Sequence, residues 1–279
     1  MTDVYVVELN KFHPRPFVFS EAADCLTSSL RELGLSVEHV YEGGQPGLML
    51  VLGLFQAPAD PALFPPDGTI LFNFEILNSQ SVVVTHSYRE LLNRYRVIDY
   101  SDQNLVSRPI SAPASAVWPV VPPPISATPR LDDRLTDVLF FGSSNARRSE
   151  MLDRLEQDGI RVERVSGAYG SELRPALARA RLVLNLHYYE EAVFPPLRVV
   201  GPYAFGLPIV MEASHFSVGC DWTYSGIRLA HYDDLLTACE RELEAPTHSP
   251  SVYEQRTRFR SELQSVFQTR ARAFLDALV

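Results

Sequence analysis

Short apolar runs alternate with amphipathic segments along most of the 279 residues. In the first part of the chain the apolar runs include VYVVEL, LMLVLGLF and TILFNFEI, and the helix-like segments include EAADCLTSSLREL and SYRELLNRY. After a break the alternation resumes with DVLFFG, LVLNLHYY and PIVMEAS among RRSEMLDRLEQ, SELRPALARA and DDLLTACERELE. Such alternation is typical of parallel sheets covered by helices. The pattern predicts an α/β protein built from two Rossmann-like domains.

The break is a proline-rich segment, SRPISAPASAVWPVVPPPISATPR, which begins at Ser107. Proline lacks a backbone donor and has a fixed φ, so this segment continues neither a helix nor a central strand. We therefore predict an N-terminal domain over residues 1–106, a connector over 107–133 and a C-terminal domain over 134–279. The last domain is predicted to end in a long amphipathic helix with one apolar face, made by Val252, Phe259, Leu263, Phe267, Phe274 and Leu275.

Composition excludes several classes of partner. The net charge of −9 at pH 7 gives no overall attraction to nucleic acid, so we expect no nucleic-acid partner. No window approaches the roughly 18 to 20 apolar residues of a membrane span. The three cysteines have neither metal-ligand nor disulfide-framework spacing, and no metal site is predicted. An odd number of thiols fits a reducing compartment, and we predict a cytoplasmic protein.

The stretch DVLFFGSSNARRSE is the first candidate site. A parallel strand followed by small residues and a helix start directs free backbone N–H groups to one point, which favours an anion. Gly142 and Ser143 form the turn, and Arg147 and Arg148 add charge suited to phosphate. In the alternative interpretation Gly142 only permits a tight turn and the arginines cover a solvated helix face. The three-glycine dinucleotide fingerprint is absent, so NAD and FAD are not predicted.

A second polar cluster follows the run LVLNL. His187, Glu190 and Glu191 come directly after this expected strand, and Arg198 opens the next expected helix. Ligands bind outside the carboxyl ends of parallel strands, so this cluster is placed for binding. The alternatives are a hydrogen-bonded loop histidine and a pair of glutamates that cap a helix.

Together these segments, with GIRVERVSGAYGSEL and PPLRVVGPYAFGLPIVMEAS, resemble the C-terminal domain of group 1 GT-B glycosyltransferases, in a divergent bacterial branch. The resemblance implies two Rossmann-like domains facing a cleft, with the acceptor mostly on the N-terminal domain and a nucleotide-sugar donor on the C-terminal one. It implies donor-site roles for Gly142, Ser143, Arg147, Arg148, Tyr169, His187, Arg198 and Glu212.

One position departs from the family pattern. The family has two glutamates around this loop, one near the sugar and one on the ribose; Glu190 matches the first, whereas Arg198 stands at the second. Arginine has donors only and cannot accept a hydrogen bond from a ribose hydroxyl. Arg198 therefore suits a phosphate clamp, a different nucleotide or a protein that has lost activity. Glu212 is the candidate for the missing carboxylate.

The N-terminal segments FNFEIL and RVIDYSDQN resemble strand ends of the same bacterial branch. The resemblance places Glu75, Asp99, Ser101 and Asn104 on the acceptor side, and His13 lies in the first strand-to-helix loop. If transfer inverts configuration, His13, Glu75 or Asp99 would be the base; retention, usual in group 1 relatives, needs no strong base. The alternative is that these residues are caps and turn formers.

The sequence thus predicts a metal-independent hexosyltransferase-like enzyme without a cofactor. It would move a sugar from a nucleotide-sugar donor to a small molecule, a glycan or another acceptor, with Glu190 orienting the sugar. Two alternatives remain open: a catalytically inactive nucleotide-sugar-binding or structural protein of the same fold, and a sugar-nucleotide epimerase.

Overall fold

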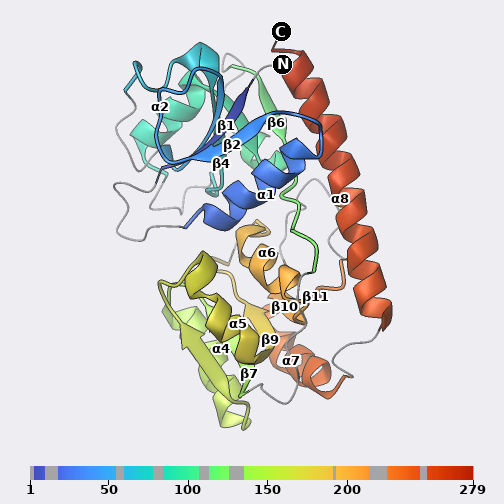
Figure 1. Ribbon diagram of the computed structural model, residues 1–279. Helices are drawn as coiled ribbons and strands as arrows, with labels where there is room; N and C mark the ends of the chain where they lie inside the picture. Colours follow the sequence, from blue (N-terminus) through green and yellow to red (C-terminus); the bar gives the residue numbers. More distant parts are fainter. Residues whose placement is uncertain are drawn as a thin grey trace. The chain divides into compact units, whose positions relative to one another are not determined.

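The computed structural model describes residues 3–9, 18–54, 60–77, 84–106, 113–125, 135–190, 193–213, 225–245 and 250–278. The chain divides into two compact units. Unit 1 comprises residues 1–121, 217–220 and 263–279, and unit 2 comprises residues 122–216 and 221–262. Each unit contains one parallel sheet with helices (Figure 1), which confirms the predicted α/β class.

Unit 1 has a six-stranded parallel sheet in the order β2-β1-β3-β4-β5-β6. Its strands are short and largely apolar, as expected for strands buried on both faces. The strands are β1 (Val4–Glu8), β2 (Val37–Val40), β3 (Leu48–Leu52), β4 (Thr69–Asn73), β5 (Arg96–Asp99) and β6 (Ser115–Val117). The helices before β6 are α1 (Ser20–Arg31), η2 (Pro66–Gly68), α2 (His86–Arg94) and α3 (Asp102–Val106).

Part of the proline-rich segment belongs to the fold of unit 1. Strand β6 pairs with β5, and Trp118, which follows it, is fully buried. The indole ring makes edge contacts with Phe267 and Phe274 of the terminal helix α8 (Pro250–Asp276). The long C-terminal helix is therefore confirmed. Its described apolar face includes Phe259 and Leu263, both buried, while the side chain of Val252 lies outside the described residues.

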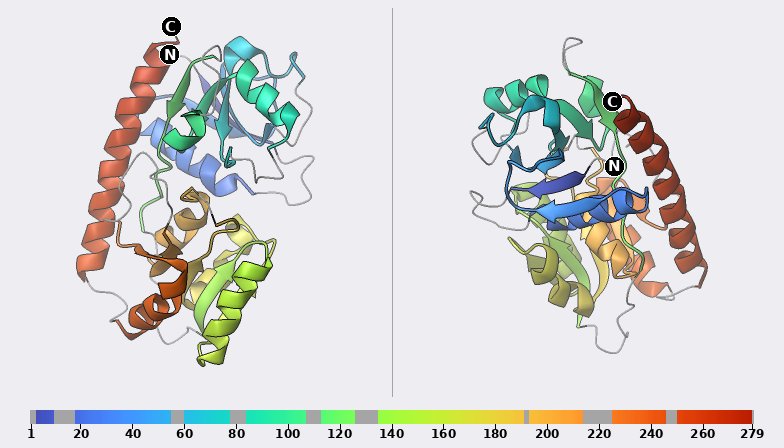
Figure 2. Two further views of the ribbon diagram at one scale, coloured as in Figure 1. Left: turned by 180° about the vertical axis from the view of Figure 1, so that it is seen from behind. Right: turned by 45° about the horizontal axis from the view of Figure 1, so that its top comes forward.

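Unit 2 has a five-stranded parallel sheet in the order β11-β10-β9-β7-β8. Helices α4 and α7 pack on one face, and α5 packs on the other; two further views are given in Figure 2. The strands are β7 (Thr136–Phe141), β8 (Val162–Val165), β9 (Ala180–Asn185), β10 (Ile209–Glu212) and β11 (Arg228–Ala230). The helices are η4 (Gly170–Glu172), α4 (Ala146–Gln157), α5 (Arg174–Arg179), α6 (Leu197–Ala204), η6 (Tyr232–Asp234) and α7 (Leu235–Glu244).

The strand order of unit 2 reverses at β7. Strand β7 pairs with β8 on one side and with β9 on the other. The chain therefore leaves the carboxyl ends of β7 and β9 in opposite directions, and the loops diverge. Such a topological switch point is where open α/β sheets bind ligands. The two candidate segments of the sequence, Gly142–Arg148 and His187–Glu190, therefore follow the carboxyl ends of the adjacent strands β7 and β9.

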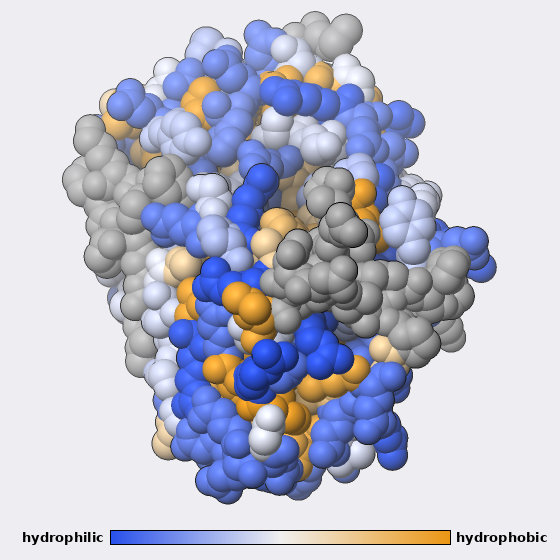
Figure 3. All heavy atoms as spheres, turned by 60° about the horizontal axis from the view of Figure 1, so that its bottom comes forward, coloured by the Kyte–Doolittle hydropathy of each residue, from blue (hydrophilic) through white to orange (hydrophobic). Residues whose placement is uncertain are grey.

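Hydrophilic side chains dominate the face of the molecule drawn in Figure 3. In the view of Figure 3 the described surface is mainly hydrophilic, with small apolar patches among strongly hydrophilic side chains. Among the described residues, no helix has both the length and the apolar character that a bilayer crossing requires.

Candidate functional site

The loop after β7 contains a glycine at a point where both the backbone conformation and a nearby side chain disfavour a larger residue. Gly142 has φ +132°, a conformation that favours glycine. A Cβ atom built at this position would lie 2.2 Å from Nη1 of Arg198. Asn145 then caps α4, because its side chain accepts a hydrogen bond of 2.9 Å from the backbone N–H of Arg148. The small-residue turn therefore makes room for a guanidinium group.

Arg198 lies in the first turn of α6. Its Nη1 donates to the backbone oxygen of Phe141 at 2.6 Å. In the described part of the chain, no carboxylate forms an ion pair with it. Burial lowers the pKa of Arg198, and Tyr169 acts in the opposite sense. The guanidinium keeps further N–H donors, so this point of the sheet edge suits an anion.

Arg148 has a different environment. It is 2% exposed, and its guanidinium donates to the backbone oxygens of Ser143, Leu186 and His187 at 2.6, 2.6 and 3.2 Å. Burial lowers the pKa of Arg148 to about 9, and the neighbouring charge of Arg198 adds to the effect. Arg148 therefore ties the loop after β7 to the loop after β9.

Arg147 and Glu212 form a two-pronged ion pair. Arg147 Nη1 lies 2.8 Å from Glu212 Oε2, and its Nη2 contacts Oε1. The guanidinium also stacks 3.9 Å from the ring centre of Tyr232. Burial alone would lower the pKa of Arg147, but the Glu212 carboxylate raises it. Glu212 further accepts the backbone N–H of His187 at 2.9 Å, so its carboxylate is occupied by residues of the protein.

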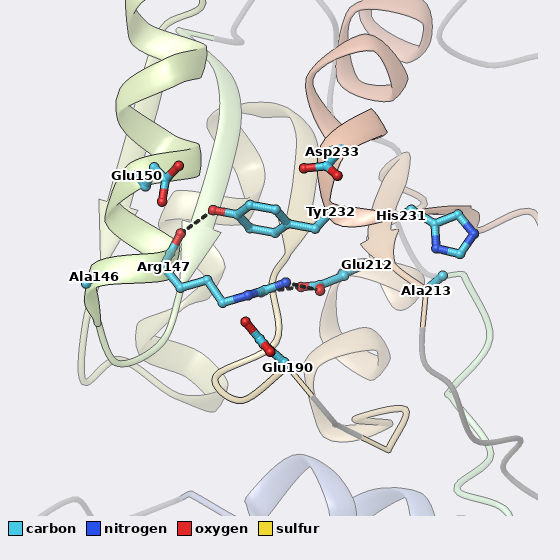
Figure 4. A pocket seen from close by; sticks show the side chains of 9 residues that line it. All are labelled: Ala146, Arg147, Glu150, Glu190, Glu212, Ala213, His231, Tyr232 and Asp233. Atoms are coloured by element: carbon cyan, nitrogen blue, oxygen red, sulfur yellow. Dashed lines mark hydrogen bonds and ion pairs between the residues drawn. The ribbon is translucent and has the colours of Figure 1, made fainter.

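A cavity of about 580 Å³ opens beside this ion pair. Figure 4 shows Glu190 beside the Arg147 guanidinium, with Glu150 and Asp233 further up the same cavity. Four carboxylates, one arginine and one histidine give it a net acidic lining. Its lining residues are Ala146, Arg147, Glu150, Glu190, Glu212, Ala213, His231, Tyr232 and Asp233.

One buried amide lies at the carboxyl end of β9. Asn185 is 2% exposed, and neither its Oδ1 nor its Nδ2 has a hydrogen-bond partner in the structure as described. Strand alternation places its side chain on the same face as Val183, the face covered by α5. Buried amides normally have partners, and losing them costs on the order of 1–3 kcal/mol. This amide therefore has unused hydrogen-bonding capacity near the switch point.

The remaining catalytic candidates lie in unit 1. Asp99 is fully buried and accepts hydrogen bonds from Asn73, Ser101 and Asn104. Glu75 is only partly buried and follows β4. His13 lies outside the described residues.

Sequence comparison finds only distant relatives. The sequence matches no protein-family model. One uncharacterized protein of Acanthamoeba polyphaga mimivirus is 32% identical over 105 residues, which cover 36% of this chain and 12% of that protein. A second protein from the same virus is 26% identical over 179 residues, which cover 59% of this chain and 24% of that protein. The chain therefore spans less than a third of the length of these relatives.

Several solved structures match nearly the whole chain. HepE of Anabaena, solved with UDP and glucose, has a TM-score of 0.59 at 11% identity and covers 99% of this chain and 100% of its own. AviGT4, a glycosyltransferase of avilamycin A biosynthesis, scores 0.54 at 15% identity, with 99% of each chain covered. The chain has the GT-B fold. Sucrose-phosphate synthase from Thermosynechococcus elongatus has a TM-score of 0.56 at 12% identity. The match covers 99% of this chain and 98% of the synthase.

Within this GT-B fold the predicted donor residues fall into groups. Arg198 lies against Gly142. Arg148 donates to the backbone oxygen of His187 and so joins the loops after β7 and β9. Arg147, Glu190 and Glu212 line the cavity. The sequence interpretation missed the cavity residues Glu150, His231, Tyr232 and Asp233; the segment HYDD directly after the strand-like run GIRLA was the available signal.

Proposed function

We propose that this chain is a glycosyltransferase that uses a nucleotide sugar and binds its diphosphate at the switch point of unit 2. The observation that carries the proposal is Arg198, a partly buried cation without a carboxylate partner among the described residues, held against the backbone of Gly142. A diphosphate supplies the missing counter-charge. The fold supports the proposal, since HepE was solved with UDP and glucose, and a DNA-modifying β-glucosyltransferase (TM-score 0.53, 12% identity, covering 99% of each chain) with uridine diphosphoglucose.

The position of Arg198 suits the chemistry of glycosyl transfer. When the bond between the sugar and the diphosphate breaks, negative charge grows on the leaving phosphate. Fixed N–H donors on Arg198 stabilise that charge more strongly in the transition state than in the ground state. Because the arginine supplies positive charge at this point, we expect transfer to proceed without added divalent metal.

The cavity beside Arg147 suits a hydroxyl-rich group. Carboxylates accept hydrogen bonds from ribose or sugar hydroxyls, and Glu150, Glu190 and Asp233 line the cavity. Its volume of about 580 Å³ lies within the usual range for small-molecule sites. We expect Glu190 to orient the sugar. The acceptor would be a small molecule, a glycan or another hydroxyl compound.

The test is direct binding of UDP and UDP-glucose by calorimetry. In Arg198→Gln we expect UDP affinity to fall about 10- to 100-fold, because a hydrogen bond to a charged group is worth roughly 1.5–3 kcal/mol. The matched control is Arg174→Gln, an exposed arginine of the same unit, which should bind UDP like the wild type. Failure of the wild type to bind any nucleoside diphosphate would contradict the proposal.

A second candidate function rests on the same residue. Arg198 stands where the family pattern has a glutamate, which favours a protein that binds a nucleotide sugar without turning it over. Binding of UDP-glucose with no release of UDP across a panel of acceptors would support this alternative.

A further inference from the structure

Strands β7 and β9 part before they end. The last pair in their register is Leu139 with Val183. Beyond this pair, β7 continues to Phe141 beside β8, and β9 continues to Asn185 beside β10. Phe141 and Asn185 each lie two residues past the last pair, so they hold equivalent places on the two sides of the switch point.

The side chain of Asn185 and the Arg198 guanidinium lie at the same end of this sheet. Strand alternation places Asn185 with Val183 on the face covered by α5. Arg198 donates to the carbonyl of Phe141 at 2.6 Å, the residue that holds the equivalent place on β7. Tyr169, directly before η4 and α5, is close enough to act on the charge of Arg198. The amide and the guanidinium are therefore neighbours across the split between β7 and β9.

A comparison with unit 1 shows how unusual the Asn185 amide is. Asn73 ends β4 as Asn185 ends β9, and both side chains are buried. The Asn73 amide donates to the Glu75 carbonyl and to Asp99, and it accepts from the Glu75 N–H and the Tyr88 hydroxyl. The Asn185 amide has no partner at either atom within the described ranges. A buried amide in this state lowers stability, and such groups are found at functional sites.

The neighbouring arginine has what the Asn185 oxygen lacks. A guanidinium carries five N–H donors and no acceptor, and the described hydrogen bond to Phe141 uses one nitrogen, Nη1. A diphosphate in front of Gly142 competes with the Phe141 carbonyl for this group, because a charged acceptor forms the stronger hydrogen bond. A guanidinium that turns toward the diphosphate is free to donate at its other side to Asn185 Oδ1.

We propose that Asn185 is a positioning residue of the diphosphate site. In the nucleotide-bound protein its Oδ1 accepts a hydrogen bond from Arg198 and orients the guanidinium toward the diphosphate. This inference rests on the proposed function, in which Arg198 binds that group. Every residue involved belongs to unit 2. Because the hydrogen bond forms only with ligand, Asn185 lowers the stability of the unliganded protein and raises its affinity for the nucleotide.

The test is a double-mutant cycle of UDP binding, measured by calorimetry on the wild type, Asn185→Val, Arg198→Gln and the double variant. We expect Asn185→Val to lower UDP affinity about 5- to 10-fold, within the range of couplings between contacting residues. In the Arg198→Gln background the same substitution should change UDP affinity less than about twofold, because the group that Asn185 orients is absent. An amide that only supports the fold gives additive effects instead.

Thermal unfolding without ligand gives a second readout. Asn185→Val removes an unpaired buried amide, so we expect the melting temperature to rise by about 2–6 °C. The matched control is Thr136→Val at the other end of the same sheet, where a buried hydroxyl donates to Glu163 at 3.0 Å. It should lower the melting temperature and leave UDP affinity unchanged. Asn185→Ala tests the site with a smaller side chain and should lose UDP affinity like Asn185→Val.

The outcomes separate the two proposals. A wild type that binds no nucleoside diphosphate overturns both. If the wild type binds UDP and Arg198→Gln weakens that binding, the proposed function stands, and three results overturn this inference alone. They are UDP affinities of Asn185→Val and Asn185→Ala within about twofold of the wild type, additive effects in the cycle, and a melting temperature that falls in both Asn185 variants.

Discussion

Asp99 of unit 1 and the arginine-paired carboxylates of unit 2 have different surroundings. In unit 2, Asp137 pairs with two arginines, and Glu163 and Glu212 each pair with one. In unit 1, Asp99 is buried deeper than any of these and is held by two asparagine amides and a backbone N–H. Cations neutralise the three carboxylates of unit 2, whereas neutral donors surround Asp99.

The difference appears in the proton affinity of the carboxyl groups. Hydrogen bonds from Arg161 hold the pKa of Asp137 below its usual range, and those from Arg179 lower the pKa of Glu163. Burial raises the pKa of Asp99 to about 7 although amides donate to it. Neutral donors therefore offset the cost of burial only in part. Among the described residues, neither Arg198 of unit 2 nor Glu75 of unit 1 forms an ion pair.

The largest expected effect on stability comes from removing the centre of the unit 1 network. Asp99→Ala removes the acceptor of one buried N–H each on Asn73, Asn104 and Ser101, at roughly 1–3 kcal/mol each, so we expect the free energy of unfolding of unit 1 to fall by at least about 3 kcal/mol. Denaturant titration, with hydrogen exchange to localise the change, measures it. The exposed Asp102→Ala is the control. A loss below about 1 kcal/mol would mean that the amide network stabilises little.

The pH dependence of stability should differ between the units. Asp99 and Glu75 have pKa values near 7 in the folded protein, above their ordinary 3.8 and 4.5. The folded state therefore binds more protons, and the stability of unit 1 falls as pH rises through this window. His39, whose pKa is raised to about 9 by hydrogen bonds to Asp24 and Glu8, stabilises fully below pH 6.5 and loses that contribution as pH rises through 9.

Asp137 and Glu163 of unit 2 have the opposite sign. Their pKa values are lowered, so their contribution is present above about pH 4.5 and is lost in acid. Hydrogen exchange of each unit at pH 4, 7 and 9 checks this contrast. Equal protection of unit 1 at pH 4 and pH 9 would refute it.

The smallest effect is expected at an exposed ion-pair cluster of unit 2. Arg164 pairs with Asp153 and Glu156, and all three side chains are at least 35% exposed. Surface pairs contribute about 0–1 kcal/mol, so Arg164→Ala should change the free energy of unfolding by less than about 0.5 kcal/mol. A larger loss in thermal unfolding would show that unit 2 depends on arginine pairs even at its surface.

The fold could be predicted from the sequence because apolar strands that alternate with amphipathic helices form a parallel sheet covered by helices. The sequence also indicated that Arg148 is buried: Arg148, Met151, Leu152 and Leu155 follow the i, i+3, i+4, i+7 spacing of one helix face, and the structure buries all four. Our prediction for Arg148 rested on its charge and did not use its place in this apolar spacing. Arg147 and Arg148 are neighbours in sequence, yet Arg147 lines the cavity whereas Arg148 is buried against backbone carbonyls.

Other features depend on contacts that no local pattern encodes. The cavity joins α4 to the turn after β11, which lies about 85 residues further along the chain. The segments with Glu75 and Asp99 were recognisable as strand ends. The hydrogen bonds from Asn73 and Asn104 to the Glu75 carbonyl, however, form only because β4 and β5 are neighbouring strands in this register. The pairing Asn73 with Asp99 sets that register.

The contact between Gly142 and Arg198 links two positions 56 residues apart in sequence. Any side chain at 142 would occupy the space of the guanidinium, so the two positions are not free to vary independently among homologues. Lineages that keep arginine at 198 should keep glycine at 142, whereas lineages with a shorter residue at 198 lose that steric reason for glycine. Co-variation at this pair would thus record which members of the lineage kept the cation.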